Sequence, residues 1–174
     1  DVEQIDMIVS FLESQAFDVL INCTSYHKTD EVEDNGTKAV MVNAHAVEAM
    51  ARACADKGAR LVHISTDYVF SGDTDRPYTE KDPPAPINVY GVSKYLGENL
   101  ALRAHPDTLI LRVASLFGVA GASGKGGNFV ETMLRLARDR GELRVVNDVR
   151  MSPTSTRSIT EALRDLLKTA APSG

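Results

Sequence analysis

The sequence predicts an α/β fold in which helices alternate with the strands of one parallel sheet. Short apolar runs of strand length alternate with amphipathic segments of helical length along most of the chain. Helices of this length between consecutive strands are typical of βαβ units, whose strands run parallel. We therefore expect a doubly wound parallel sheet that binds its ligand at the carboxyl ends of the strands.

The first third of the chain contains two predicted strands. The spacing of Ile5, Ile8, Val9 and Leu12 is typical of an amphipathic helix, and Gly58 is the residue type that often follows a helix end. The predicted elements are, in order, this helix before Phe17, a strand over 17–22, a polar loop or irregular helix start over 24–36, a helix over 40–57 and a strand over 60–65.

The remainder of the chain repeats the alternation. Asn88 is a helix-capping residue type, and Gly141 follows an amphipathic segment. The predicted elements are a loop over 72–86, a helix from Asn88 to about Ala104, a turn over 105–107, a strand over 108–114, a glycine-rich loop over 118–127, a helix over 129–140, a strand over 143–146 and a helix over 158–169.

Composition excludes several classes of protein. The 174 residues are enough for one domain with a buried core, and a net charge of −5 argues against a nucleic-acid partner. No apolar run approaches the length of a membrane span, and the first residues do not resemble a signal peptide. Cys23 and Cys54 form no CxxC pair, and the four histidines show no ligand spacing. We expect a cytoplasmic protein with no metal site and no membrane partner.

Tyr90 and Lys94 form the first candidate for chemistry. Residues four apart lie on one face of a helix, and a neighbouring ammonium lowers the pKa of a tyrosine by favouring the phenolate. Such a pair suits general acid–base catalysis on a hydroxyl or carbonyl group. On its own the spacing is weak, because most isolated matches are a half-buried tyrosine beside a solvated lysine.

Two strand ends supply further candidates. Thr66 and Asp67 follow the second predicted strand, and Thr24, Ser25 and Tyr26 follow the first. Ligands of open α/β sheets bind at these ends, where Thr66 could bind a substrate oxygen and small residues let a flat ligand approach. The alternative is local structure alone, with Thr66 ending the strand and Asp67 forming an Asx-turn.

Together these segments resemble a known family. The stretch Ile64–Phe70 (ISTDYVF), followed by PYTEKDPPAPINVYGVSK over Pro77–Lys94, resembles the extended short-chain dehydrogenase/reductases and, among them, the dTDP-4-dehydrorhamnose reductase family. Weaker matches, in order along nearly the whole chain, are Asp18–Thr24, Asp30, Glu33, Asn43, Arg112–Gly118, Gly126–Val130, Val146–Asp148 and Ser152–Thr154.

The resemblance implies a reductase that transfers hydride from NADPH or NADH to the 4-keto carbon of a dTDP-sugar. Tyr90 would give a proton to the keto oxygen, Thr66 would orient the carbonyl in place of the usual serine, and Asp67 would lie near the sugar. Asn128 and its glycine-rich loop would lie on the substrate side.

The resemblance also implies a cofactor side. Lys94 would hold the nicotinamide ribose and tune Tyr90. Residues 24–26 would line the cofactor, and Asn43 would support the sheet edge behind it. The choice between NADH and NADPH, metal use and oligomeric state stay open, with a homodimer as one option.

The chain departs from the family pattern in two ways. No glycine-rich turn of the GxGxxG type, which seats a dinucleotide pyrophosphate, occurs before Asp18. We therefore expect residues 1–174 to be the central and C-terminal part of one Rossmann-like NAD(P)-binding domain, a fragment without its first βαβ unit and its C-terminal lobe. Ser115 replaces the tryptophan that the family usually has near the sugar, and 148–153 departs from Asp-Gln-x-Gly-Ser-Pro.

Two alternatives remain from the sequence. One is a non-catalytic protein similar to the regulatory subunit of methionine adenosyltransferase, which shares a stretch like Pro84–Gly91. The other is a different extended-family enzyme, a nucleotide-sugar epimerase or dehydratase. The presence of Thr66, Tyr90 and Lys94 together favours catalysis, and the Thr-Asp-Tyr-Val-Phe stretch favours a reductase.

Overall fold

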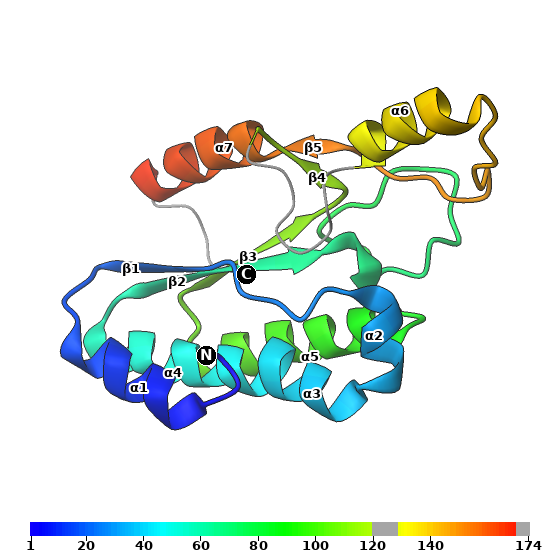
Figure 1. The fold of residues 1–174 in the computed structure, drawn as a ribbon. Helices are drawn as coiled ribbons and strands as arrows, with labels where there is room; N and C mark the ends of the chain where they lie inside the picture. Colours follow the sequence, from blue (N-terminus) through cyan, green and yellow to red (C-terminus); the bar gives the residue numbers. More distant parts are fainter. Residues whose placement is uncertain (120–128, 170–174) are drawn as a thin grey trace. The chain divides into compact units, whose positions relative to one another are not determined.

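The computed structural model describes residues 1–119 and 129–169 (Figure 1). It divides into two compact units, one over Asp1–Arg112 and one over Val113–Ala171, and each is described by itself. No helix of the described residues is long and apolar enough to cross a membrane.

The first unit is built on a three-stranded sheet of order β1-β2-β3. The strands are β1 (Val19–Asn22), β2 (Arg60–Thr66) and β3 (Thr108–Val113). β1 and β2 are parallel, and Asn22 is the register partner of His63 at the carboxyl end of β1. The predicted parallel α/β arrangement is thus confirmed, and each predicted strand of this unit lies within two residues of its expected bounds.

Helices of the first unit cover one face of this sheet (Figure 1). Their bounds are α1 (Ile5–Ser14), α2 (Thr29–Asp34), α3 (Gly36–Val40), α4 (Ala46–Lys57) and α5 (Val89–Ala104). Fully buried side chains of α4, β2 and α5 form the main core cluster: Val47, Ala51, Cys54, Leu61 and Ala101. The predicted helix ends are confirmed at Gly58, which has a left-handed φ of 65°, and at Asn88, whose side chain accepts a hydrogen bond from the Gly91 amide.

One long helix contains a wider turn. α3 continues into a π-helical turn, η1 (Met41–His45), and then into α4. The predicted helix over 40–57 therefore begins earlier, at Gly36, and α2 forms within the segment that we predicted as loop or irregular helix start. π-turns of this kind often occur at functional sites, and this one carries the buried Asn43.

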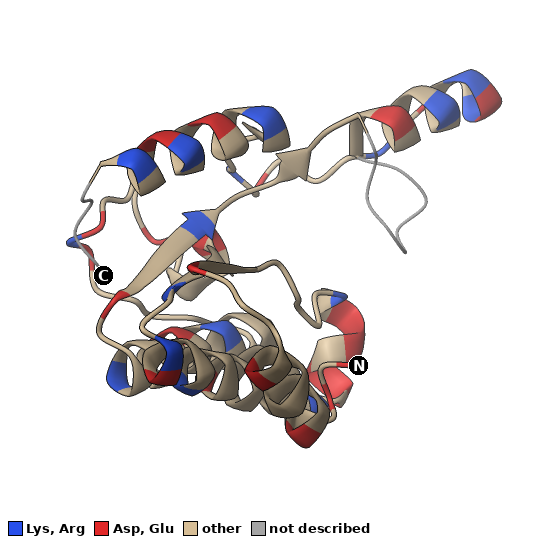
Figure 2. Ribbon diagram, turned by 90° about the vertical axis from the view of Figure 1, so that its left-hand side faces the viewer, with Lys and Arg blue, Asp and Glu red and all other residues tan. Residues whose placement is uncertain are grey.

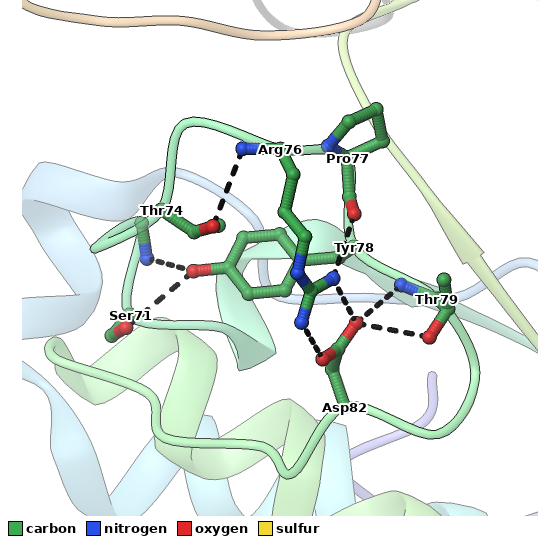
Figure 3. Close-up of polar contacts among 8 residues, drawn as sticks. Ser71, Thr74, Arg76, Pro77, Tyr78, Thr79 and Asp82 are labelled. Atoms are coloured by element: carbon green, nitrogen blue, oxygen red, sulfur yellow. Dashed lines mark hydrogen bonds and ion pairs between the residues drawn. The ribbon is translucent and has the colours of Figure 1, made fainter.

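The long segment between β2 and α5 starts with a 3₁₀ turn, η2 (Asp67–Val69), and continues as the predicted loop. Figure 3 shows how polar contacts close this loop. Asp82 pairs with the guanidinium of Arg76 and accepts hydrogen bonds from the backbone and hydroxyl of Thr79, the backbone bond at 2.7 Å. The Tyr78 hydroxyl accepts a 2.8 Å hydrogen bond from the Gly72 amide, and its ring stacks on Phe70 at 4.3 Å.

The second unit contains two helices and two short strands. α6 (Phe129–Arg140) buries none of its residues, whereas α7 (Thr156–Lys168) buries Leu163. Ser155 precedes α7 as its N-cap, and its hydroxyl accepts a hydrogen bond from the Arg157 amide. Figure 2 shows charges of both signs along α7. β4 (Leu116–Phe117) and β5 (Thr154–Ser155) pair in parallel.

The predicted strand over 143–146 is wrong. This segment has no regular secondary structure, and Val145 and Val146 are exposed. An apolar run becomes a strand only where another strand can pair with its backbone. In the described part of this unit the pairing is instead made by β4 and β5, which are too short to give a periodic signal.

Candidate functional site

The polar turn after β2 forms one wall of the candidate site. Thr66 is buried, and its hydroxyl accepts a 3.2 Å hydrogen bond from the Tyr68 amide. The same hydroxyl donates to Asp67 Oδ1 at 3.2 Å. Burial raises the pKa of Asp67, and the hydrogen bond from Thr66 opposes that rise. The local turn that we considered as the alternative is therefore present, together with the side chains expected for a site.

Tyr90 lies in the first turn of α5 against this wall. Its ring meets the ring of Tyr68 edge to face, with centroids 5.5 Å apart. Gly91 allows this approach, because a Cβ at that position would overlap the carbonyl oxygen of Tyr68. The first turn of α5 thus fits closely onto the turn that follows β2.

The environment of Tyr90 brings together hydroxyls from three elements. The hydroxyls of Ser25 and Thr66 lie near its side chain and lower its pKa by hydrogen bonding, but burial is the larger effect and raises it. The negative charge of Asp67 raises it further. The pKa of Tyr90 thus moves in the opposite direction from the one we predicted from a neighbouring lysine, and Tyr90 stays a neutral phenol at neutral pH.

Lys94 is buried in the interior behind Tyr90. Its Nζ donates a 2.7 Å hydrogen bond to the carbonyl oxygen of Ile64 and lies 3.1 Å from His63 Nε2. Burial lowers the pKa of Lys94 to about 8, against the opposing effects of Glu98 and Cys23. The amine therefore contacts β2, which explains why it does not act on Tyr90 in the way the helix spacing alone suggested.

Asn43 holds the loop after β1. Its side-chain oxygen accepts a 2.8 Å hydrogen bond from the Tyr26 amide, and its nitrogen donates to the Tyr26 carbonyl at 3.0 Å. It also bonds the hydroxyls of Ser25 and Ser93. The predicted cofactor-side residues 24–26 and Asn43 thus lie together, and Ser93, which the sequence analysis missed, links them to α5.

An ion pair between the buried Glu98 and the half-buried Arg112 is connected to the site through Ser65, the neighbour of Thr66. Glu98 of α5 accepts a 2.5 Å hydrogen bond from Ser65 and a 2.6 Å bond from Arg112 Nη2, with Arg112 Nε at 3.0 Å. The Arg112 guanidinium also lies over the ring of Phe70 at 5.1 Å. Sequence reasoning missed Glu98, although a carboxylate one turn after Lys94 on the same helix face could have indicated it.

The side chains at the candidate site could bind a nucleotide through their hydroxyl groups. Hydroxyl groups of Ser25, Thr66 and Tyr90 gather at the carboxyl ends of β1 and β2, where nucleotides bind in open α/β sheets. Residues 1–18 contain no glycine and supply no pyrophosphate turn. Within residues 1–119 and 129–169, no group of three or more His, Cys, Asp or Glu residues could hold a metal ion.

Two predicted substrate features fall in the second part of the chain. Asn128 lies outside the described residues. Ser115 has a left-handed φ of 42°, and its hydroxyl lies 2.5 Å from the sulfur of Met151. Residues other than glycine rarely adopt this backbone conformation, and a bulky tryptophan would be disfavoured in it.

Comparisons with known proteins identify the family of the chain. Residues 1–173 match the family model described as RmlD substrate binding domain. The chain is 38% identical over 170 residues to dTDP-4-dehydrorhamnose reductase from Burkholderia thailandensis, covering 98% of this chain and 55% of that protein. It is 44% identical over 150 residues to the reductase of the same name from Mycobacterium tuberculosis, covering 84% and 48%.

Solved structures give the same result. The crystal structure of dTDP-4-dehydrorhamnose reductase from Bacillus anthracis in complex with NADP matches with a TM-score of 0.89 and 36% identity, over all of this chain and 60% of that one. The reductase from Clostridium acetobutylicum matches with a TM-score of 0.88 and 34% identity, over 97% and 58%. The chain spans about half of the length of the two curated reductases and somewhat more of the two solved chains.

Proposed function

The chain belongs to the RmlD substrate-binding-domain family, and on that premise we propose that its protein reduces the 4-keto group of dTDP-4-dehydro-L-rhamnose with NADPH or NADH. The observation that carries the proposal is the meeting of the Tyr90, Thr66 and Ser25 hydroxyls at the carboxyl ends of the strands. The relatives named dTDP-4-dehydrorhamnose reductase support the substrate, and the NADP complex of one of them supports the cofactor.

Tyr90 is the proton donor in this proposal. A reduction needs an acid that is protonated before the reaction, and burial keeps the Tyr90 phenol in that form at neutral pH. When the phenol gives its proton to the keto oxygen, the hydroxyls of Ser25 and Thr66 would turn from their present acceptors, Asn43 and Asp67, and donate to the resulting phenolate. Asp67, beside them, would accept a hydrogen bond from a sugar hydroxyl.

Residues 24–26 and Lys94 would hold the nicotinamide end of the cofactor, which supplies a hydride to C4 of the sugar. Asn43 fixes the backbone of this loop through both polar atoms of its amide. The loop is therefore preorganised before any ligand binds, which reduces the entropy lost on binding. Asn128 and a homodimer remain predictions of the sequence.

The proposal is tested by replacing Tyr90. In the full-length protein, assayed by NADPH oxidation with dTDP-4-dehydro-L-rhamnose, we expect Tyr90→Phe to lower kcat by about 10²–10⁴-fold. Tyr95→Phe, which removes a hydroxyl from the next turn of the same helix, should leave kcat unchanged. A wild-type protein without turnover would contradict the reductase function and favour a non-catalytic role, and full activity in Tyr90→Phe would contradict the role of Tyr90.

A further inference from the structure

Three buried polar side chains form a hydrogen-bonded network behind the candidate site. Asn22 at the end of β1, His63 in β2 and Lys94 in α5 are 3%, 0% and 1% exposed. Asn22 Nδ2 lies 3.0 Å from His63 Nδ1, and His63 Nε2 lies 3.1 Å from Lys94 Nζ. The positions of the protons in this network follow from which of its atoms must donate and which must accept.

Thr24 fixes the orientation of the Asn22 amide. Its backbone N–H donates to Asn22 Oδ1 at 2.9 Å, and its hydroxyl donates to the same oxygen at 2.7 Å. A backbone N–H can only donate, so the amide oxygen must face Thr24. The amide nitrogen therefore faces His63.

His63 is consequently held in one tautomer. The Asn22 nitrogen donates to Nδ1, so Nδ1 carries no proton. Burial lowers the pKa of His63 well below its ordinary value, and a charged Lys94 lowers it further, so the ring is neutral in either state of Lys94. With Nδ1 accepting from Asn22, the single proton of the neutral ring lies on Nε2. That proton points at Lys94 Nζ, which can accept it only as an uncharged amine and still donates to the Ile64 carbonyl.

We propose that Asn22 and His63 are positioning residues that select the uncharged amine of Lys94. Burial acts in the same direction and, against the opposing effects of Glu98 and Cys23, lowers the pKa of Lys94 to about 8 without any contribution from His63. For Lys94 to gain a proton and donate to Nε2, the ring must carry its proton on Nδ1. The Asn22 amide must then turn and release Thr24, the first residue of the loop 24–26.

The charge of Lys94 is thereby coupled to the loop that the proposed function assigns to the cofactor. This functional consequence rests on that proposed function, whereas the tautomer of His63 does not.

The tautomer can be measured directly in the full-length wild-type protein. Proton-coupled ¹⁵N NMR of the His63 ring distinguishes a protonated Nε2 from a protonated Nδ1. Above about pH 8, where Lys94 is uncharged, we expect the proton on Nε2. A proton on Nδ1 would overturn the proposal without any substitution.

Asn22→Asp reverses the direction of the hydrogen bonds from residue 22 through His63 to Lys94, with little change in side-chain shape. A carboxylate still accepts both hydrogen bonds from Thr24, but it also accepts from Nδ1–H, so the ring proton moves and the Lys94 ammonium can donate to Nε2. We expect the midpoint of the Lys94 titration, followed by its ¹⁵Nζ signal, to rise by about one to three pH units. Asn99→Asp, which adds the same charge on the exposed side of α5, should leave the midpoint unchanged.

His63→Gln separates the tautomer from the added charge. The glutamine amide can present its oxygen to the ammonium, so the Lys94 midpoint should rise although no charge is added, and an unchanged midpoint would overturn the proposal. The pH profile of kcat should move with the Lys94 midpoint in both variants. If the NMR results hold but the protein reduces no substrate, the reductase function fails and the proposal on Lys94 stands.

Discussion

The two units of the molecule bury their apolar residues to very different degrees. Asp1–Arg112 contains a core cluster of five fully buried residues from α4, β2 and α5. Among the described residues of Val113–Ala171, Leu163 is the buried apolar side chain, and α6 buries none although its apolar residues follow helical spacing. Periodicity thus predicts that a helix forms, but burial depends on neighbouring elements that the same stretch of sequence does not specify.

The comparison has a consequence for function. The side chains that surround Tyr90 lie in the first unit, and Thr66 and Tyr90 belong to β2 and α5, which contribute to its core. Sites built on helices and strand ends keep their geometry better than sites on loops alone. Substitutions in the two units should therefore differ most in stability, and this difference can be measured.

A matched pair of leucines gives the largest expected contrast. Leu61 is fully buried in the core cluster, whereas Leu134 of α6 is 55% exposed. We expect Leu61→Ala to lower the free energy of unfolding by about 3 kcal/mol, through lost apolar burial and a cavity. Leu134→Ala should change it by less than about 0.5 kcal/mol. Urea unfolding followed by circular dichroism measures both, and equal losses would contradict the difference between the units.

A pair of glycines tests how closely the elements of the first unit approach. A Cβ at Gly97 would overlap the carbonyl oxygen of Asn43, so Gly97→Ala should cost about 2 kcal/mol as α5 moves away from the π-turn. At Gly36 the nearest atom to such a Cβ is a methyl of Val89 at 3.5 Å, and Gly36→Ala should be neutral or slightly stabilising. Thermal unfolding of both variants provides the measurement.

The smallest effect concerns the exposed loop of Figure 3. Hydrogen bonds from Arg76 and from the Thr79 amide hold the pKa of Asp82 well below its ordinary value. Because the folded pKa is the lower one, the stabilisation is present above about pH 4 and is lost as the pH falls further. The protection factor of the Thr79 amide in hydrogen exchange should fall over that range in the wild-type protein. Asp82→Asn should show reduced protection and no such acid dependence, with little effect on global unfolding.

How far the sequence predicts the molecule differs between its parts. The three strands of the first unit and the helices that end at Gly58 and begin at Asn88 were predictable, because their signals are local, although β1 leaves Val19 and Ile21 exposed. The strand predicted over 143–146 was not, since an apolar run carries no information about whether a partner strand is present. β4 and β5 are each two residues long and leave no periodic signal.

The candidate site shows the same limit. The grouping of Thr66 with Ser25 followed from the rule that strand ends of a parallel sheet share one edge, whereas the place of Tyr90 beside them was implied by the family resemblance. The direction of the Tyr90 pKa did not follow, because it depends on burial and on where Lys94 points. Helix spacing places Lys94 one turn from Tyr90, but only the packing of α5 on β2 shows that its amine contacts Ile64 and His63.

The wider turn at Met41–His45 lies where one long helix changes from contacting the site to contacting the core. Before and within it, the helix presents Asn43 to the loop at Tyr26; after it, α4 presents Val47 to the core. One residue corresponds to about 100° of rotation in an α-helix. Removing a single residue here would turn either the asparagine away from the loop or α4 away from the sheet. The number of residues in this turn therefore sets the angle between the site and the core that supports it.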